Sequence, residues 1–153
     1  MSNESGTQEL REMKSAPIGN RELSGNVIAA AIEVHRALGP GFLESIYEEA
    51  LCVELAARDI RFERQKSLSI VYRGHPVGEH RLDLLVEAAL IVELKAVSML
   101  DDIHFSIVRS YLKALDLEDA LLLNFAASPL CIKRVGRETL PDFLSSRFNQ
   151  SPE

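Results

Sequence analysis

The amino-acid sequence predicts an α/β domain with a mixed central sheet flanked by helices, in the element order ααβββαββα. Apolar residues recur at helical spacing over residues 24–38 and 42–59, and again over 101–117. Five runs rich in apolar and β-branched residues lie between and after these segments, and such runs are typical of strands. Strands that alternate with helices in this way favour a sheet with helices on its faces.

Two helices are predicted before the sheet. The first covers residues 24–38, with Ser24 as its N-cap and Gly39 as the residue that ends it. Gly39-Pro40-Gly41 then forms a turn, because glycine and proline interrupt regular structure. The second helix covers residues 42–59, which are rich in good helix formers.

Three consecutive strands, expected to be antiparallel, follow at residues 61–74, 75–87 and 89–97. A helix with Asp101 or Asp102 near its N-terminus comes next, where the helix dipole favours an acid. The last elements are two strands, at 120–126 and 130–136, and a short closing helix at 140–148.

The length of 153 residues is that of one domain. We expect a polar N-terminal arm at residues 1–22, the domain at 23–148 and a short tail at 149–153. The start of the sequence lacks the basic and apolar segments of a secretory signal, and no run approaches the ~18 apolar residues of a membrane span. A cytoplasmic protein without a membrane partner is therefore expected, and its apolar helix faces and sheet edges allow a homodimer.

Charge and cysteine content narrow the function classes. The net charge is −6, which argues against a protein that coats nucleic acid, because such proteins neutralise phosphates. An enzyme with a local contact to nucleic acid is still allowed. Cys52 and Cys131 lie in apolar surroundings and are predicted to be free thiols, and no zinc-finger spacing is present. Any metal should therefore be bound by oxygen ligands.

The apolar run around Glu93 and Lys95 predicts a central strand that is buried on both faces. Side chains alternate along a strand, so Glu93 and Lys95 project to the same side. Buried charges cost several kcal/mol each unless they are compensated. A structural ion pair and a functional site both explain this pattern.

Asp83 interrupts the preceding apolar strand, and pairing of the two strands can bring it beside Glu93. Two neighbouring carboxylates repel each other unless a cation lies between them. Mg²⁺ or Mn²⁺ prefers such oxygen ligands, and Lys95 could then hold a water molecule or a phosphate oxygen. The residues predict, in outline, a metal site for phosphodiester hydrolysis.

Asp83 and Glu93-Leu94-Lys95 match the D…(D/E)xK signature, so the sequence resembles the PD-(D/E)XK nuclease superfamily. Residues 41–47, GFLESIY, resemble the GxxExxY signature of one bacterial family in that superfamily. The resemblance runs from about residue 23 to 136, and it includes Glu63-Arg64-Gln65 and Asn124-Phe125. It implies a PD-(D/E)XK nuclease-like core of one helix, three strands, a second helix and a further strand.

The resemblance also implies roles for single residues. Asp83 and Glu93 would be catalytic metal ligands, Lys95 would position the attacking water, and Glu44 would add a carboxylate from the helix before the sheet. Tyr47, by contrast, is interpreted as a core aromatic residue.

Three further residues bear on substrate and activity. Arg81 shares a strand face with Asp83 and is a candidate phosphate contact, although a surface salt bridge explains it equally well. His104 could face the cleft from the later helix, although a satisfied or exposed histidine is the commoner explanation. Ile107 stands where many superfamily members carry a glutamine or another polar residue.

The sequence therefore predicts a Mg²⁺- or Mn²⁺-dependent phosphodiesterase acting on nucleic acid, DNA or RNA. The first alternative is a catalytically silent binding module of the same fold, with nucleic-acid or protein partners. The second is a structural interaction domain in which Glu93 and Lys95 form an internal ion pair without a metal.

Overall fold

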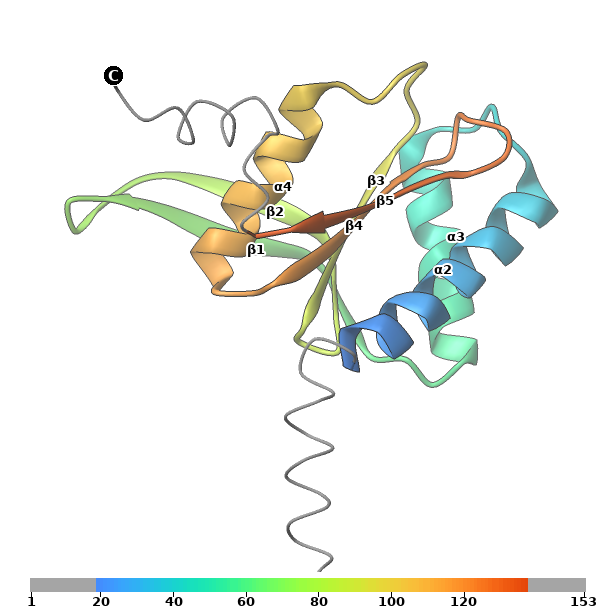
Figure 1. The fold of residues 1–153 in the computed structure, drawn as a ribbon, viewed down its shortest axis with the longest axis horizontal. Coiled ribbons are helices and arrows are strands. Elements are labelled where there is room, and N and C mark those ends of the chain that lie inside the picture. The colour runs from blue at the N-terminus through green and yellow to red at the C-terminus, as the bar shows by residue number, and fades with distance from the viewer. Residues whose placement is uncertain (1–18, 138–153) are drawn as a thin grey trace, which may run out of the picture.

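The computed structural model describes residues 19–137 (Figure 1). Its elements are α2 (Gly19–Leu38), α3 (Glu44–Ala57), β1 (Phe62–Tyr72), β2 (His75–Val86), β3 (Leu90–Lys95), α4 (Asp102–Leu115), β4 (Asp119–Asn124) and β5 (Cys131–Gly136). The predicted order ααβββαββ is confirmed for this part of the chain. The predicted closing helix, the tail and residues 1–18 of the predicted arm lie outside the described residues.

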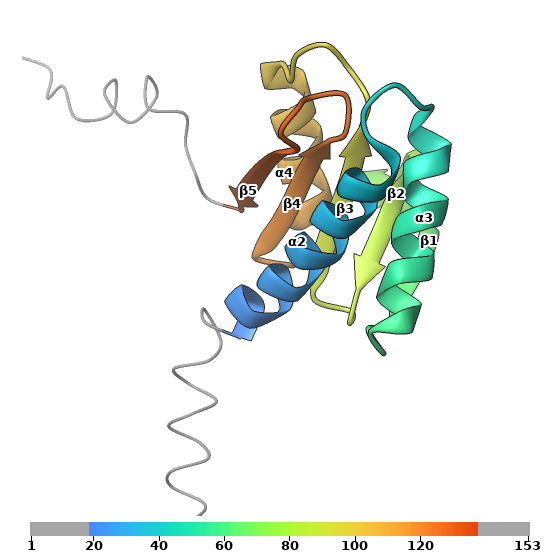
Figure 2. The same cartoon turned by 90° about the vertical axis from the view of Figure 1, so that its right-hand side faces the viewer.

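The sheet is mixed, as predicted, and its strands follow the order β1-β2-β3-β4-β5. β3 and β4 are parallel, and the other neighbouring strands are antiparallel. Helices α2 and α3 cover one face of the sheet, and α4, which connects β3 to β4, covers the other (Figure 2). None of the helices in residues 19–137 has the length and apolar character that a membrane crossing requires.

The central strand β3 supplies side chains to both faces of the sheet. Leu90, Val92 and Leu94 belong to the core under α2 and α3. Ile91 belongs to the core under α4. Glu93 has the same parity as Ile91, so it projects from the face that α4 covers, in line with Lys95.

The first helix starts earlier than predicted. Helix α2 already begins at Gly19, so the prediction that Ser24 is its N-cap is wrong. Ser24 lies inside the helix, where its hydroxyl donates a hydrogen bond to the carbonyl of Arg21 and accepts one from Arg134. Residues 19–22, assigned to the arm on their polarity, are helical.

The turn before α3 is held by Tyr47. Gly39 and Gly41 have φ values of +70° and +114°, which glycine adopts without a steric penalty. The Tyr47 hydroxyl donates a hydrogen bond to the Gly39 carbonyl and accepts one of 3.1 Å from the Phe42 N–H. Its ring is fully buried and stacks on Phe125 with a centroid distance of 4.6 Å. The structural interpretation of Tyr47 is confirmed.

We expect Tyr47→Phe to lower the free energy of unfolding by about 1 to 2 kcal/mol, because both hydrogen bonds to the turn are lost while the ring stays. Urea denaturation measures the change. Tyr72→Phe is the matched control, because the Tyr72 side chain is 62% exposed at the end of β1. Equal effects of the two substitutions would contradict this role of Tyr47.

Candidate active site

The site lies where β2 and β3 separate. The two strands pair only through Leu84–Val86 of β2 and Leu90–Val92 of β3. Beyond Leu84 and Val92, β2 continues with β1 into a hairpin that leaves the body of the molecule, while β3 stays paired with β4 (Figure 1). Backbone groups at the opening therefore lack the partners that a continuous ladder would supply.

The carboxylates of Asp83 and Glu93 fill this opening. The backbone N–H of Asp83 donates a hydrogen bond of 2.8 Å to Glu93 Oε1. The backbone N–H of Leu94 donates one of 2.9 Å to Asp83 Oδ2. Each side chain thus binds the other strand, and the two predicted site residues are brought together.

Burial and mutual repulsion make this pair costly to ionise. Burial raises the pKa of Glu93 to about 8, with the charge of Asp83 as the second cause. Burial also raises the pKa of Asp83, while the Leu94 N–H and the charge of Lys95 act in the opposite direction. A cation beside both carboxylates would stabilise their charged forms.

Glu44 faces the same region from the first turn of α3. Burial raises its pKa, the charge of Lys95 lowers it, and the charge of Asp83 raises it. A hydrogen bond from the backbone of Ala96, just after β3, lowers it as well. Glu44 therefore lies beside the end of β3 and close to Asp83 in electrostatic terms.

The three acids do not form a closed cage. Within residues 19–137, no three histidine, cysteine, aspartate or glutamate side chains are grouped so that they could hold a metal ion. The structure thus joins Asp83 with Glu93 and leaves Glu44 at the border of the site. Two carboxylates fit the requirement of Mg²⁺, which proteins often bind through one or two carboxylates, with waters and substrate phosphates as the other ligands.

Lys95 is half-buried at the end of β3, next to these acids. Its positive charge lowers the pKa values of Asp83, Glu93 and Glu44. None of the ion pairs within 4.0 Å between residues 19 and 137 includes Lys95. Its ammonium group thus acts on all three acids from more than 4.0 Å. The second alternative function, a structural domain with an internal Glu93–Lys95 ion pair, is therefore not supported by the described residues.

Asn124 fixes the chain just beyond Lys95. It is buried at the end of the parallel neighbour β4. Its amide accepts a hydrogen bond of 3.1 Å from the Val97 N–H and donates one of 2.8 Å to the Val97 carbonyl. This contact restrains the segment that follows β3 and helps to hold Lys95 in place.

Two acids on neighbouring strands, with a lysine two residues after the second, are the arrangement that the D…(D/E)xK pattern predicts. The sequence model of the PD-(D/E)XK nuclease superfamily matches residues 21–135, which is most of the chain. The chain belongs to the PD-(D/E)XK nuclease superfamily. Nucleases of this superfamily generally use divalent metals.

The chain was also compared with solved structures and with curated proteins. A solved structure described as "Crystal structure of SSO0001" is 16% identical to this superfamily member, with a TM-score of 0.47. The match covers 67% of this chain and 54% of that one, so this chain spans about half the length of that protein. No curated protein matches the chain.

Sequence reasoning missed a second layer of this nuclease-like site, formed by Glu48 and Gln65 beside Asp83. Glu48, one turn after Glu44, is only 8% exposed. Its carboxylate accepts hydrogen bonds of 2.7 Å from Gln65 and 3.1 Å from Arg64. Gln65 Nε2 also lies 3.4 Å from Asp83 Oδ1. The signal in the sequence was the spacing of Glu44 and Glu48, which places both acids on one face of a helix.

Gln65 links Glu48 to Asp83 from a strained backbone position. Its φ is +48°, which is uncommon for a residue with a side chain. It stands opposite Asp83, between the paired residues Arg64 and Lys66. The strain is therefore located beside the site, where such conformations are frequently found.

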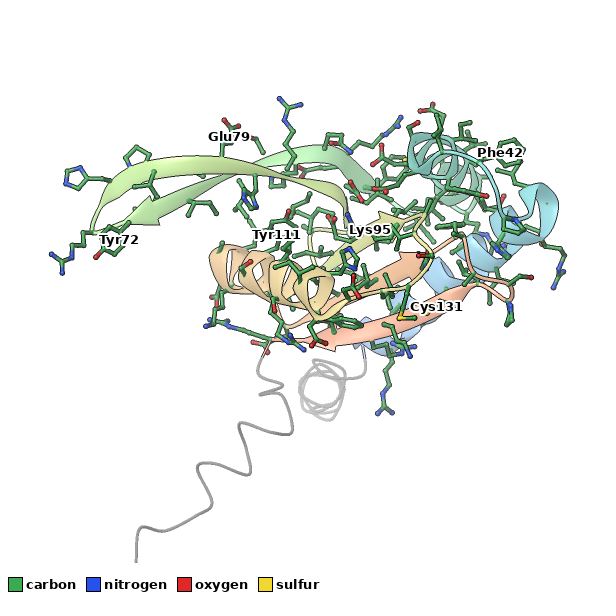
Figure 3. All side chains as sticks on the ribbon, turned by 90° about the horizontal axis from the view of Figure 1, so that it is seen from above. Phe42, Tyr72, Glu79, Lys95, Tyr111 and Cys131 are labelled. Carbon is green, nitrogen blue, oxygen red and sulfur yellow. The ribbon has the colours of Figure 1, made fainter. Side chains whose placement is uncertain are left out.

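Four residues of helix α4 and its N-cap bear on the site: Asp101, His104, Ile107 and Tyr111. His104 Nδ1 accepts a hydrogen bond of 2.9 Å from the Asp101 N–H, as part of a capping box. Asp101 is the N-cap and Asp102 the first residue of the helix, so both acids lie at its N-terminus, where one of them was predicted. Ile107 packs against the core under α4. Tyr111 was not predicted to be near the site. Burial and the negative charges of Glu93 and Asp83 raise the pKa of its hydroxyl, which places it close to both acids. Figure 3 shows Tyr111 and Lys95 in the central part of the molecule.

Proposed function

We propose that this domain is a Mg²⁺- or Mn²⁺-dependent phosphodiesterase that acts on nucleic acid, DNA or RNA. One observation carries the proposal. Asp83 and Glu93 meet at the opening between β2 and β3 through hydrogen bonds of 2.8 and 2.9 Å, and Lys95 stands beside them without an ion-pair partner among residues 19–137.

The proposed roles follow from position and charge. Asp83 and Glu93 would hold the metal, and Glu44 would add a third carboxylate at the border of the site. A bound divalent ion lowers the pKa of a water molecule and stabilises charge on a phosphate. Lys95 would orient the attacking water or bind a phosphate oxygen, because its ammonium group donates hydrogen bonds and forms no ion pair with the described residues 19–137.

The finer predictions are part of the same proposal. Arg81 is exposed on β2, two residues before Asp83, and would bind a substrate phosphate. His104 would contact substrate only in addition to its capping role. Membership of the bacterial GxxExxY family, a cytoplasmic location and a homodimer are likewise proposed.

The silent binding module is the second candidate function. It is favoured by Ile107, which offers the site no polar group, and by the lack of a three-acid metal group in residues 19–137. Such a module would keep the fold and bind nucleic acid or protein without cleavage. A cleavage assay with added metal separates the two functions.

Metal binding is the first test of the proposal. Millimolar Mn²⁺ should raise the melting temperature, because a ligand that binds only the folded state stabilises it, by about 2.7 kcal/mol at one hundred times the dissociation constant. Asp83→Asn should lose most of this gain while its side-chain oxygen still accepts the Leu94 N–H. Thermal unfolding with and without Mn²⁺ measures both effects.

Asp59→Asn is the matched control, because Asp59 is exposed beyond the end of α3 and asparagine tolerates its φ of +57°. This variant should keep the full gain. A wild-type melting curve that Mn²⁺ does not change would count against a metal site at Asp83 and Glu93.

A further inference from the structure

The hairpin of β1 and β2 extends beyond the body of the molecule. Figure 1 shows it leaving the sheet on the side away from α2 and α3, and Figure 3 shows Tyr72 at its tip. All residues from 71 to 80 are exposed. A two-stranded ribbon without cover has little stability of its own, so this length of hairpin calls for an explanation.

The charge of the hairpin is opposite to that of the chain. Residues 66–82 contain Lys66, Arg73 and Arg81 but only one acid, Glu79, which gives this stretch a net charge of +2 with histidines neutral. Lys66 forms an ion pair of 2.9 Å with Glu63, just before this stretch, so the cations that matter here are Arg73 and Arg81. The whole chain carries −6, so the remaining residues carry −8. The positive charge is thus concentrated on one projecting element, which favours a polyanionic partner.

The tip also exposes apolar and aromatic side chains. Val71, Tyr72 and Val77 are 59%, 62% and 61% exposed. The guanidinium of Arg73 lies 5.5 Å from the centre of the Tyr72 ring. An exposed aromatic ring beside an arginine is the combination on which nucleic-acid bases stack next to a bound phosphate.

The backbone conformation at the tip also supports a binding role. Arg73 and Gly74 have φ values of +50° and +78°, the signature of a turn in which asparagine is strongly preferred at the first position. Arginine occupies that position against this preference. Arginine therefore occupies this position at a conformational cost, and such costs are frequent at ligand-binding sites.

The base of the hairpin leads directly into the site. Arg81 stands two residues before Asp83 on β2, and Gln65, which lies 3.4 Å from Asp83, precedes Lys66 on β1. A strand of nucleic acid bound along the hairpin would therefore run toward the opening between β2 and β3.

We infer that the β1–β2 hairpin is a nucleic-acid-binding arm, with Arg73 bound to the phosphate backbone and the Tyr72 ring stacked on a base. The choice of partner rests on the proposed function. The arm supplies the local positive surface that an otherwise acidic nuclease domain needs, and it contacts the strand at a distance from the scissile phosphate.

The test is equilibrium binding in EDTA, where no divalent metal is present and binding is measured apart from cleavage. Short fluorescein-labelled DNA and RNA oligonucleotides, single-stranded and duplex, are titrated with the full chain between about 50 and 200 mM salt. Arg73→Asn keeps a residue that suits the turn, so the hairpin should still form. It should weaken binding about fivefold and reduce the salt dependence by about one counterion.

Two further variants and a control sharpen the result. Tyr72→Ser should weaken binding to the single strands by about fivefold or more, the loss expected for one stacked base. Glu79→Gln should strengthen binding, because it removes the acid of the exposed stretch 71–80. Arg36→Asn, in the last turn of α2, changes the charge by the same amount as Arg73→Asn at the other end of the molecule and should leave binding unchanged.

Equal affinities of the wild type and Arg73→Asn, equal losses in Arg73→Asn and Arg36→Asn, or no binding to any probe would overturn the inference. So would a dimer, seen by sedimentation, that Tyr72→Ser abolishes while nucleic-acid binding is unchanged. Cleavage in Mn²⁺ with no effect of Arg73→Asn would reject the arm and keep the nuclease. Arm-dependent binding without any cleavage would keep the arm and reject the nuclease.

Discussion

Lys95→Met should lower cleavage of nucleic acid by about two to three orders of magnitude while the domain stays folded. Methionine keeps much of the apolar stem of the lysine and removes its ammonium group. The loss expected for one group that stabilises transition-state charge or orients a water molecule is of this size. The fold should tolerate the change, because Lys95 is half-buried and takes part in none of the ion pairs described within residues 19–137.

The measurement is cleavage of a panel of single- and double-stranded DNA and RNA in Mn²⁺, with a urea denaturation curve for each protein. Lys133→Met is the matched control, because Lys133 is exposed on the edge strand β5 and should change neither quantity. If wild type cuts no member of the panel, the nuclease proposal should be given up for the binding module. If Lys95→Met cuts as well as wild type, Lys95 has no part in the reaction.

The pairing of Asp83 with Glu93 was predictable because both residues break apolar runs. A charge inside a buried strand is costly, so it identifies itself in the sequence, and the ten-residue spacing allowed two antiparallel strands to bring the acids together. The same reasoning identified Lys95 by its parity with Glu93. The separation of β2 and β3 at this point could not be predicted from the sequence, because the pattern of apolar residues does not show where the hydrogen bonding between two strands ends.

The second layer of the site depends on contacts that only the folded chain makes. Glu48 and Gln65 are 17 positions apart and look like ordinary polar residues of a helix and a strand. The strained backbone of Gln65 has no local signal, since glutamine lacks the special tolerance that glycine or asparagine has for positive φ. The prediction of Ser24 as an N-cap was wrong because the local sequence suggested a helix start that the folded chain does not use. Ser24 has the local properties of a cap, but the helix continues through it from Gly19.

The hairpin illustrates a third limit. The break between the first two strands was predicted after Gly74, and the structure places the turn of the hairpin at Arg73-Gly74. Exposure of the whole outer half could not be predicted, because its valines and tyrosine are residues that a buried strand would also use. Only the arrangement of α4, which covers the inner part of the hairpin through Leu68 and Ile70, shows where the cover ends.

In the absence of metal, the stability of the domain should fall as the pH rises from about 5 to about 8, and Glu93→Gln should remove most of this dependence. Burial and the charge of Asp83 raise the pKa of Glu93 from its ordinary value of 4.5 to about 8. In that interval the unfolded chain has lost the proton of Glu93 and the folded chain retains it, so the folded state binds more protons and each rise in pH favours unfolding. At about 1.4 kcal/mol per pKa unit, the loss over these three pH units is on the order of 3 to 4 kcal/mol.

Urea denaturation in EDTA at several pH values measures this loss, and the difference between wild type and Glu93→Gln isolates Glu93 from the other titrating groups. Glutamine keeps an oxygen that can accept the Asp83 N–H, so the variant should fold and should be more stable than wild type at pH 8. Mn²⁺ should reverse the trend in wild type, because the ion favours the charged carboxylates and its stabilising effect should therefore grow between pH 6 and pH 8. Parallel stability profiles of wild type and Glu93→Gln in EDTA would mean that Glu93 is ionised at low cost, and the electrostatic argument for a cation at this site would then be lost.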